Sequence, residues 1–295
     1  MAFHSFDKPN PFIGVGLRHP HYQQALDHQP EHLSFVEIHA ENFFASGGIT
    51  KQLLADVRNQ YEISVHGTSL GLGSQQRVPP EVLEQFSQLV AFSQPCLVSE
   101  HLCFNRALID NKLMHSGDLL PIPYNKASLE LICGHINEVQ DAIRRPLLIE
   151  NLSAYLQPTE LAAHAQDDMT EVEFWHAMCR QSGCGILLDI NNLIVNALNQ
   201  KVTNVEAEVT RILEAVSPEF VGEIHLAGFT DNKVNGFIVD DHGAQVSELC
   251  WKLYQKALKL FGNLPTLVEW DTQLPSWETL TAQSDRAYKF AKENG

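Results

Sequence analysis

Eight short apolar runs, separated by segments with helical spacing, constrain the fold of this 295-residue chain more than any other feature. Runs rich in Val, Ile, Leu and Phe are typical of strands that are buried on both faces. Between most of them, apolar residues recur three and four positions apart, which predicts helices at 79–94, 125–143, 170–183, 202–216 and 246–261. The runs are "FIGVGLRH", "SFVEIHAEN", "ISVHGTS", "CLVSEHLCF", "PLLIENLS", "CGILLDINN", "FVGEIHLAGF" and "PTLVEWD".

Buried strands that alternate with helices form a parallel sheet, and eight such units predict a closed (β/α)8 TIM barrel. An open doubly wound sheet is the alternative, but no GxGxxG motif follows the first strand. No Pro/Gly-rich linker divides the chain, so we expect one barrel domain over residues 1–295. The longest irregular segments, 68–80, 105–125 and 227–243, each follow a strand and are expected at the catalytic face.

The composition excludes several classes of partner. With 20 basic and 36 acidic residues, the net charge of −16 opposes the phosphate neutralisation on which nucleic-acid binding depends. The apolar runs are too short to span a membrane, and the N-terminus lacks the features of a secretory signal. The six cysteines contain no CxxC pair, which favours reduced thiols and a cytoplasmic location.

Nearly every run ends on side chains that can bind metal. One polar residue at a strand end usually caps a helix or holds a loop, but here the pattern repeats around the predicted barrel. The strand-end residues are Glu37, His39, Glu41 and Asn42; His66; Glu100 and His101; Glu150 and Asn151; Asp189, Asn191 and Asn192; Glu223 and His225; Asp240, Asp241 and His242; and Glu269 and Asp271.

Acids and imidazoles that converge on one axis need a compensating cation. Burying one unpaired carboxylate costs on the order of several kcal/mol. No lysine stands at a predicted strand end, and Arg18 is the one basic residue near such a position. The sequence therefore predicts metal ions, and a His/Asp/Glu/Asn set without Cys points to iron, manganese or zinc. The number of ligand candidates leaves room for two or three ions in an open, catalytic site.

The strand-end motifs resemble those of a known family. The strings "GVGLRHPHY", "FVEIHAENFF", "SVHGTSLGLGS", "LVSEHLCF", "LLIENLSAYL", "LLDINNLIVNALN", "EIHLAGF", "DDHG" and "LVEWD" are similar to those of the multinuclear non-haem iron-dependent oxidative enzymes, which include the methanobactin biosynthesis oxidase. The match runs in order over residues 12–272. Within the family, the chain most resembles a proteobacterial branch encoded beside small Cys-rich precursors, some of which are the copper-sequestering bufferins.

The resemblance implies a xylose-isomerase-like TIM barrel with two or three irons, Fe(II) or Fe(III), at its C-terminal face. Glu150 and Glu269 are the candidates for bridging carboxylates, and we take Glu150, Asp240 and His242 as the catalytic residues. The choices between Asp240 and Asp241, and between His101 and Glu100, stay open. Carried over residue by residue, the implied metal ligands are His66, His101, Glu150, Asp189, Asn192, His225, Asp240, His242 and Glu269.

The resemblance also implies the chemistry. Family members oxidise cysteine residues of ribosomally made precursor peptides with O2, often with a partner protein that presents the precursor. A substrate thiolate binds iron, and a hydrogen is removed from the cysteine Cβ. The products differ between members, including oxazolone with thioamide, thiooxazole and excised carbon, and the sequence does not choose among them.

Three other functions share parts of this pattern. A divalent-metal sugar isomerase or epimerase has the same barrel and donor types, but commonly uses a strand-end lysine that this chain lacks. A zinc phosphodiesterase also fits the ligands, although the net charge of −16 opposes a DNA groove. A module that stores or delivers metal without turnover is the third. Outside the ligand set, we expect His39 to support a ligand or orient substrate, and we consider His115 and Tyr155 as substrate contacts.

Overall fold

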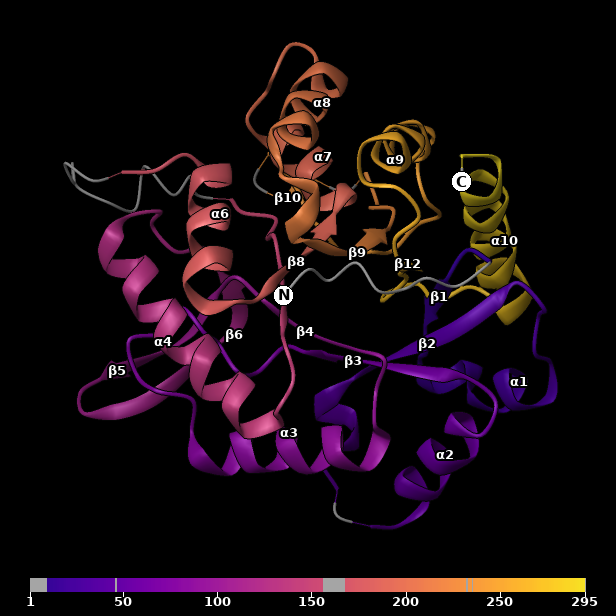
Figure 1. Cartoon of the computed structure of the whole chain (residues 1–295), viewed down its shortest axis with the longest axis horizontal. Coiled ribbons are helices and arrows are strands. Elements are labelled where there is room, and N and C mark those ends of the chain that lie inside the picture. Colours follow the sequence, from indigo (N-terminus) through magenta and orange to yellow (C-terminus); the bar gives the residue numbers. More distant parts are fainter. Residues whose placement is uncertain (1–9, 46, 156–167, 232, 235, 295) are drawn as a thin grey trace.

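The barrel predicted from the alternating pattern is confirmed. The computed structural model describes residues 10–45, 47–155, 168–231, 233–234 and 236–294. Eight parallel strands close into a barrel in the order β1–β12–β9–β8–β7–β4–β3–β2, with helices around it (Figure 1). The barrel strands are β1 (Ile13–Gly16), β2 (Leu33–His39), β3 (Glu62–Gly67), β4 (Leu97–His101), β7 (Leu148–Glu150), β8 (Gly185–Asp189), β9 (Val221–Leu226) and β12 (Thr266–Val268).

The five predicted helical segments all form helices, and further helices accompany them. None of the helices in the described residues has both the length and the apolar character needed to cross a membrane. The α-helices are α1 (Tyr22–Asp27), α2 (Ile49–Arg58), α3 (Pro80–Ser93), α4 (Lys126–Ile143), α6 (Glu171–Ser182), α7 (Ile190–Asn199), α8 (Val205–Ala215), α9 (Glu248–Phe261) and α10 (Trp277–Asn294). Short 3-10 helices lie at η1 (His19–His21), η2 (Ala40–Phe43) and η3 (Pro218–Phe220).

Helix α7 begins one residue after β8, where the sequence pattern indicated only the end of a strand. Asp189, the last residue of β8, accepts the backbone N–H of Asn192 at 2.6 Å and so caps the helix. A side-chain oxygen in this position satisfies one of the N–H groups that a first helical turn leaves unpaired. The string "LDINN" therefore combines a strand end with a helix start, and it presents Asn192 from a rigid first turn.

Segment 105–125, which we expected to be irregular, forms most of a β-hairpin instead. Its antiparallel strands are β5 (Phe104–Ile109) and β6 (Lys112–Leu120). Asp110 and Asn111 join them with φ angles of 50° and 58°, and two-residue hairpin turns favour Asn and Asp at such angles. A smaller hairpin, β10 (Lys233–Val234) and β11 (Phe237–Ile238), lies within the irregular segment 227–243.

The barrel interior is layered because side chains on a strand alternate between its two faces. Phe35, Glu37 and His39 of β2 share one face, and Leu97, Ser99 and His101 of β4 follow the same sequence of types. The first layer is apolar, and on β2, β4, β7 and β8 the residue two positions further along the strand is polar. The apolar layer contains Phe12, Phe35, Leu97, Leu148, Leu187 and Leu267.

Alanine substitution of two glycines tests this packing. At Gly222 in β9, a Cβ atom would lie 2.5 Å from Leu148 Cδ2, so Gly222→Ala should lower the free energy of unfolding by about 1–3 kcal/mol. Gly134 on the exposed side of α4 has no atom within 4 Å of a built Cβ, so Gly134→Ala should raise that free energy by about 0.5–1 kcal/mol. Urea unfolding of the two variants measures both. If the two substitutions change the free energy of unfolding in the same direction, the packing described for Gly222 and Gly134 is wrong.

Candidate metal centre

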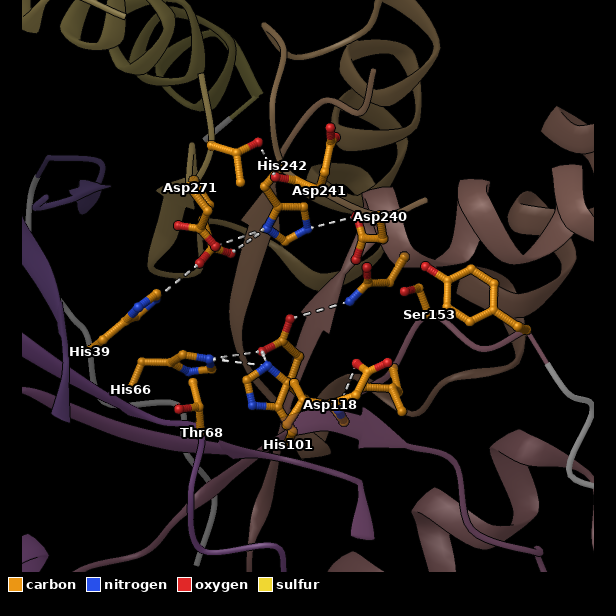
Figure 2. Close-up of a pocket in the computed structure, with 17 residues that line it drawn as sticks. His39, His66, Thr68, His101, Asp118, Ser153, Asp240, Asp241, His242 and Asp271 are labelled. Carbon is orange, nitrogen blue, oxygen red and sulfur yellow. Dashed lines mark hydrogen bonds and ion pairs between the residues drawn. The ribbon is translucent and has the colours of Figure 1, made fainter. Parts of the chain in front are cut away.

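A cavity of about 300 Å³ opens at the carboxyl ends of the barrel strands. His66 of β3, His101 of β4 and Glu150 of β7 line it from one side, and His242 and Glu269 line it from the other. Figure 2 shows His66, His101 and His242 turned toward the same space. Seven of the nine implied ligands line this cavity, and the other two, Asp189 and His225, are fully buried next to Glu150 and Glu269. Barrel enzymes hold their active sites at this end of the strands.

The first group consists of His66, His101 and Glu150, all buried. Both imidazole Nε2 atoms lie 3.3 Å from Glu150 Oε2 and 3.3 Å from each other. The far nitrogens are held from behind, because His66 Nδ1 lies 2.7 Å from Ser99 Oγ and His101 Nδ1 lies 3.1 Å from the Gly67 carbonyl oxygen. Each ring thus presents Nε2 to one carboxylate oxygen, and a metal ligand is usually oriented in this manner.

The second group joins Glu150 to Asp189, His225 and Glu269, again all buried. His225 Nδ1 lies 3.2 Å from Glu269 Oε2 and 4.0 Å from Glu150 Oε1. Asp189 caps α7 with Oδ1, while its Oδ2 remains without a hydrogen-bond partner. Asn192 lies beside this group, with its Nδ2 3.4 Å from Glu150 Oε1. Glu150 therefore belongs to both groups, as a bridging carboxylate requires.

The third group consists of His242, Glu269 and Asp271. His242 Nδ1 lies 3.2 Å from Glu269 Oε2, and its Nε2 lies 3.0 Å from Asp240 Oδ1. Asn191 Nδ2 donates to the same Asp240 oxygen at 2.9 Å and fixes that carboxylate. Glu150 is shared by the first and second groups, and Glu269 by the second and third. These two carboxylates therefore connect three neighbouring groups of potential ligands.

The two choices left open by the sequence have clear geometric answers. Asp241 uses both oxygens within its loop, accepting from Thr230 and from the Gly243 N–H, whereas Asp240 lies against His242. Glu100 is buried and accepts the backbone N–H groups of His101 and of Leu70. Asp240 and Asp241 both line the cavity, but only Asp240 lies against His242; of the other pair, His101 lines the cavity and Glu100 does not. Metal binding by any of these residues stays a prediction.

Other strand-end residues hold the backbone. Asn151 exchanges two hydrogen bonds with the backbone of Asp189, at 2.8 and 3.0 Å, which ties the end of β7 to β8. The side-chain amide of Asn151 therefore holds two strands together, and this role accounts for it without metal binding. Glu41 accepts the Thr68 N–H at 2.9 Å, and Asn42 is exposed. His115 lies exposed on β6 and does not line the cavity, whereas His39 and Tyr155 do.

Arg18 contributes a buried positive charge to the cluster, a role that the sequence pattern did not predict. Its buried guanidinium donates to Asp271 at 2.8 Å through Nε and to Glu269 at 3.1 Å, and it lies 2.8 Å from His39 Nε2. One basic residue therefore neutralises part of the acidic cluster without metal. No contact joins it to Glu150 or Asp189, so these carboxylates must be compensated by protons, by the neighbouring imidazoles or by a cation.

Unpaired polar atoms test whether metal fits these residues. Among the described residues, buried atoms without a hydrogen-bond partner are concentrated in the cluster. A buried polar atom that lacks a partner costs roughly 1–3 kcal/mol, so such atoms are usually explained by an ion or a water. Their mixed nitrogen and oxygen chemistry suits iron, manganese or zinc. They include Asp189 Oδ2, Asn191 Oδ1, Asn192 Oδ1 and Glu150 Oε2, the last of which lies 3.3 Å from both imidazole Nε2 atoms of the first group.

The titration of these groups reflects their crowding. Burial raises the pKa of Glu150 to about 8 and that of Asp189 to about 7. Burial alone would lower the pKa of His101, but the Glu150 and Glu100 carboxylates outweigh it and raise that pKa to about 9. For His66, burial and the neighbouring His101 hold the pKa well below its usual value. The metal-free cluster therefore retains protons at neutral pH that a bound cation would displace.

Residues 12–292 match the family model of the RiPP precursor modification enzymes MbnB/TglH/ChrH, where RiPP denotes a ribosomally synthesised and post-translationally modified peptide. The chain belongs to this family. The resemblance inferred from the strand-end motifs is therefore confirmed, and membership indicates an enzyme whose substrate is a precursor peptide. Related proteins named UPF0276 occur in Chromobacterium violaceum, with 41% identity over 93% of this chain and 92% of the relative, and in Vibrio vulnificus, with 39% identity over 94% and 91%.

Solved structures support the fold. A xylose isomerase domain protein from Alicyclobacillus acidocaldarius superposes with a TM-score of 0.59 at 11% identity, covering 97% of this chain and 99% of that chain. Endonuclease IV from Thermus thermophilus gives 0.54 at 13% identity, covering 97% and 100%. Identities this low show the fold alone, so the xylose-isomerase-like architecture is confirmed without transferring either activity.

Removing the Arg18 charge tests the electrostatics of the metal-free centre. Arg18→Met should lower the free energy of unfolding by about 3 kcal/mol, because it leaves Glu269 and Asp271 without their buried partner. The control is Arg211→Met, which breaks an ion pair with Glu208 in which the arginine side chain is 66% exposed and should cost roughly 0.5 kcal/mol or less. Urea unfolding of chelator-treated protein measures both. Similar small losses in the two variants would show that Arg18 does not compensate the cluster.

Proposed function

We propose that this enzyme is an iron- and O2-dependent oxidase that modifies cysteine residues of a ribosomally made precursor peptide, in the maturation of a natural product or a copper-binding peptide. Family membership supports the peptide substrate. The observation that carries the iron assignment is that three of the five potential ligand groups among the described residues are joined through Glu150 and Glu269, which both line one cavity. Such sharing suits two or three irons held close together.

The donor set favours iron among the possible metals. His66, His101 and Glu150 supply two imidazoles and one carboxylate on the same side of the cavity. This is the donor set of many non-haem Fe(II) oxygenases, in which the remaining positions stay open for other ligands. Closed structural zinc sites instead use four tetrahedral ligands, usually with cysteine. All six cysteines of this chain are free, and none of them lines the cavity.

Iron, when bound, would supply the one-electron chemistry through which O2 oxidises a thiol-bearing residue. The protein holds the ligand side chains in place and limits how much of the precursor enters the cavity. Ser99 and Gly67 hold the His66 and His101 rings in place, and Asn191 holds the Asp240 carboxylate. A cavity of about 300 Å³ is at the small end of ligand sites, so it admits a peptide side chain and keeps the rest of the precursor outside.

The cavity lining is consistent with a cysteine as the reacting residue. The described lining residues include no lysine and no arginine. A thiolate needs nearby positive charge, and in this cavity that charge would come from metal, with the imidazoles as its ligands. Thr68, Ser153 and Tyr155 offer hydroxyl groups for the peptide backbone. We further propose that a partner protein presents the precursor, as the resemblance implies.

The same lining disfavours the rival functions. A sugar isomerase that relies on a lysine finds none among the described lining residues. A phosphodiesterase would need to hold phosphate beside Asp118, Asp241 and Asp271, which all line the cavity. Their carboxylates repel a nucleic-acid backbone, as does the net charge of −16.

Substitution of the shared or buried ligands tests the function. Glu150→Ala and His225→Ala should each lower the iron content of anaerobically purified protein and abolish the mass change of a co-expressed Cys-containing precursor, while circular dichroism shows a folded barrel. Glu248→Ala on α9, which breaks a surface pair with Arg286, is the control and should leave both unchanged. Elemental analysis and peptide mass spectrometry provide the readouts. Wild-type turnover in either ligand variant would contradict the assignment.

Proton release provides an independent test of ligation. Glu150 and His101 interact closely: burial raises the pKa of Glu150 to about 8, and the Glu150 and Glu100 carboxylates raise the pKa of His101 to about 9, so the pair shares at least one proton at pH 7 in the metal-free protein. A cation bound by the first group must displace that proton, so its affinity should fall as pH drops below about 8. Calorimetric titration with Zn²⁺ at pH 7 in two buffers of different ionisation enthalpy should reveal at least one proton released per ion. Heats that do not depend on the buffer would argue against binding by this group.

A further inference from the structure

Two carboxylates lie beneath His225 in the barrel interior and belong to none of the predicted ligands. Glu37 of β2 and Glu223 of β9 are both 0% exposed. His225 Nε2 lies 3.5 Å from Glu37 Oε2 and 3.7 Å from Glu223 Oε1. Ser64 Oγ donates to Glu37 Oε2 at 3.4 Å. Among the described residues, Glu37 Oε1 and both Glu223 oxygens have no hydrogen-bond partner.

The two nitrogens of His225 therefore face different surroundings. Nδ1 points to Glu269 and Glu150 in the second ligand group, and Nε2 points to the Glu37 and Glu223 pair. A carboxylate that accepts the proton on the far nitrogen fixes the tautomer of an imidazole and makes its other nitrogen a stronger donor. One acceptor would be enough for orientation, so the second carboxylate adds negative charge beyond that need.

Fewer negative charges surround the first ligand group than the second. The His66 ring is held from behind by the neutral hydroxyl of Ser99, and the His101 ring by the Gly67 carbonyl with Glu100 nearby. Glu150 is the one carboxylate within that group. The second group contains Glu150, Asp189 and Glu269, with Glu37 and Glu223 directly behind its imidazole. Arg18 offsets part of this excess at Glu269.

We propose that Glu37 and Glu223 are positioning residues that hold His225 and give the ion position formed by Glu150, Asp189, His225 and Glu269 a preference for a trivalent cation. The position formed by His66, His101 and Glu150 then takes a divalent cation. In a water-poor interior, additional negative charge stabilises the more highly charged ion, because Coulomb energies scale with the product of the charges. The inference rests on the proposed metal centre, but its test needs no peptide and no turnover.

Redox-inert ions of different charge test this preference. Metal-free protein is equilibrated with Ga³⁺, supplied as its nitrilotriacetate complex, and separately with Zn²⁺; bound metal is then quantified against the competing chelator. Glu37→Gln and Glu223→Gln keep the side-chain size and remove the charge. Each should lower the Ga³⁺ affinity by about tenfold or more and the Zn²⁺ affinity by less than about threefold. Ser99→Ala behind His66 is the matched control and should weaken Zn²⁺ binding without weakening Ga³⁺ binding.

Two further measurements separate positioning from a role in folding. In crystals soaked with both ions, element-specific anomalous scattering should locate Ga³⁺ beside His225 Nδ1 and Zn²⁺ beside His66 and His101. The melting temperature of each metal-free Glu→Gln variant should equal or exceed that of the wild type, because the change removes one of two negative charges that are buried side by side. A purely structural role would lower that temperature and leave the ratio of the two affinities unchanged.

The proposal is overturned if the Gln variants bind Ga³⁺ as tightly as the wild type, if they lose both affinities equally, or if an ion lies between Glu37 and Glu223. Wild-type protein that takes up neither ion would instead overturn the metal centre itself. The two failures are therefore distinguishable.

Discussion

Charge compensation inside a buried cavity is the constraint on which the rest of this structure depends. Glu150, Asp189 and Glu269 are nearly without exposed surface and stand among imidazoles at the carboxyl ends of the barrel strands, and Glu223 lies buried beneath them. Carboxylates in such surroundings must be protonated, paired or bound to a cation. Arg18 pairs with the Glu269 side of the cluster, and the raised pKa values of Glu150 and Asp189 express the shortage on the other side. Metal ions, as proposed, would resolve that shortage and would connect the fold to its proposed chemistry.

The barrel places these groups accurately because its strands are rigid and alternate. On β2, β4 and β7, the apolar residues Phe35, Leu97 and Leu148 form a floor, and the polar residues two positions further along stand above it. The histidine rings are then fixed by neighbours that do not themselves face the cavity, such as Ser99 for His66. His66, His101, Glu150 and Asp189 stand on strand ends, which hold a site more rigidly than loops do, whereas Asp240 and His242 come from the loop after β11.

Much of the fold and the approximate site could be predicted from the sequence, because both are recorded in local patterns. The residue types at the predicted strand ends pointed to Glu150, His225 and Glu269 as neighbours, since parallel strands bring their carboxyl ends together. Pairings between distant segments could not be predicted in this way. Arg18 and Asp271 are 253 positions apart, and nothing local to Glu37 or Glu223 shows that both approach one imidazole nitrogen. The choice of Asp240 over Asp241 likewise depends on how a loop closes onto Thr230.

The proposed chemistry requires that this cluster hold several irons through shared carboxylates. Anomalous diffraction at the iron edge, from crystals of anaerobically iron-loaded protein, would locate them. Two or three iron peaks are expected at the cluster, with Glu150 contacting two of them and His66 and His225 contacting different ones. A cavity without iron after loading, or a single ion that leaves Glu150 and Glu269 unshared, would contradict the proposed chemistry.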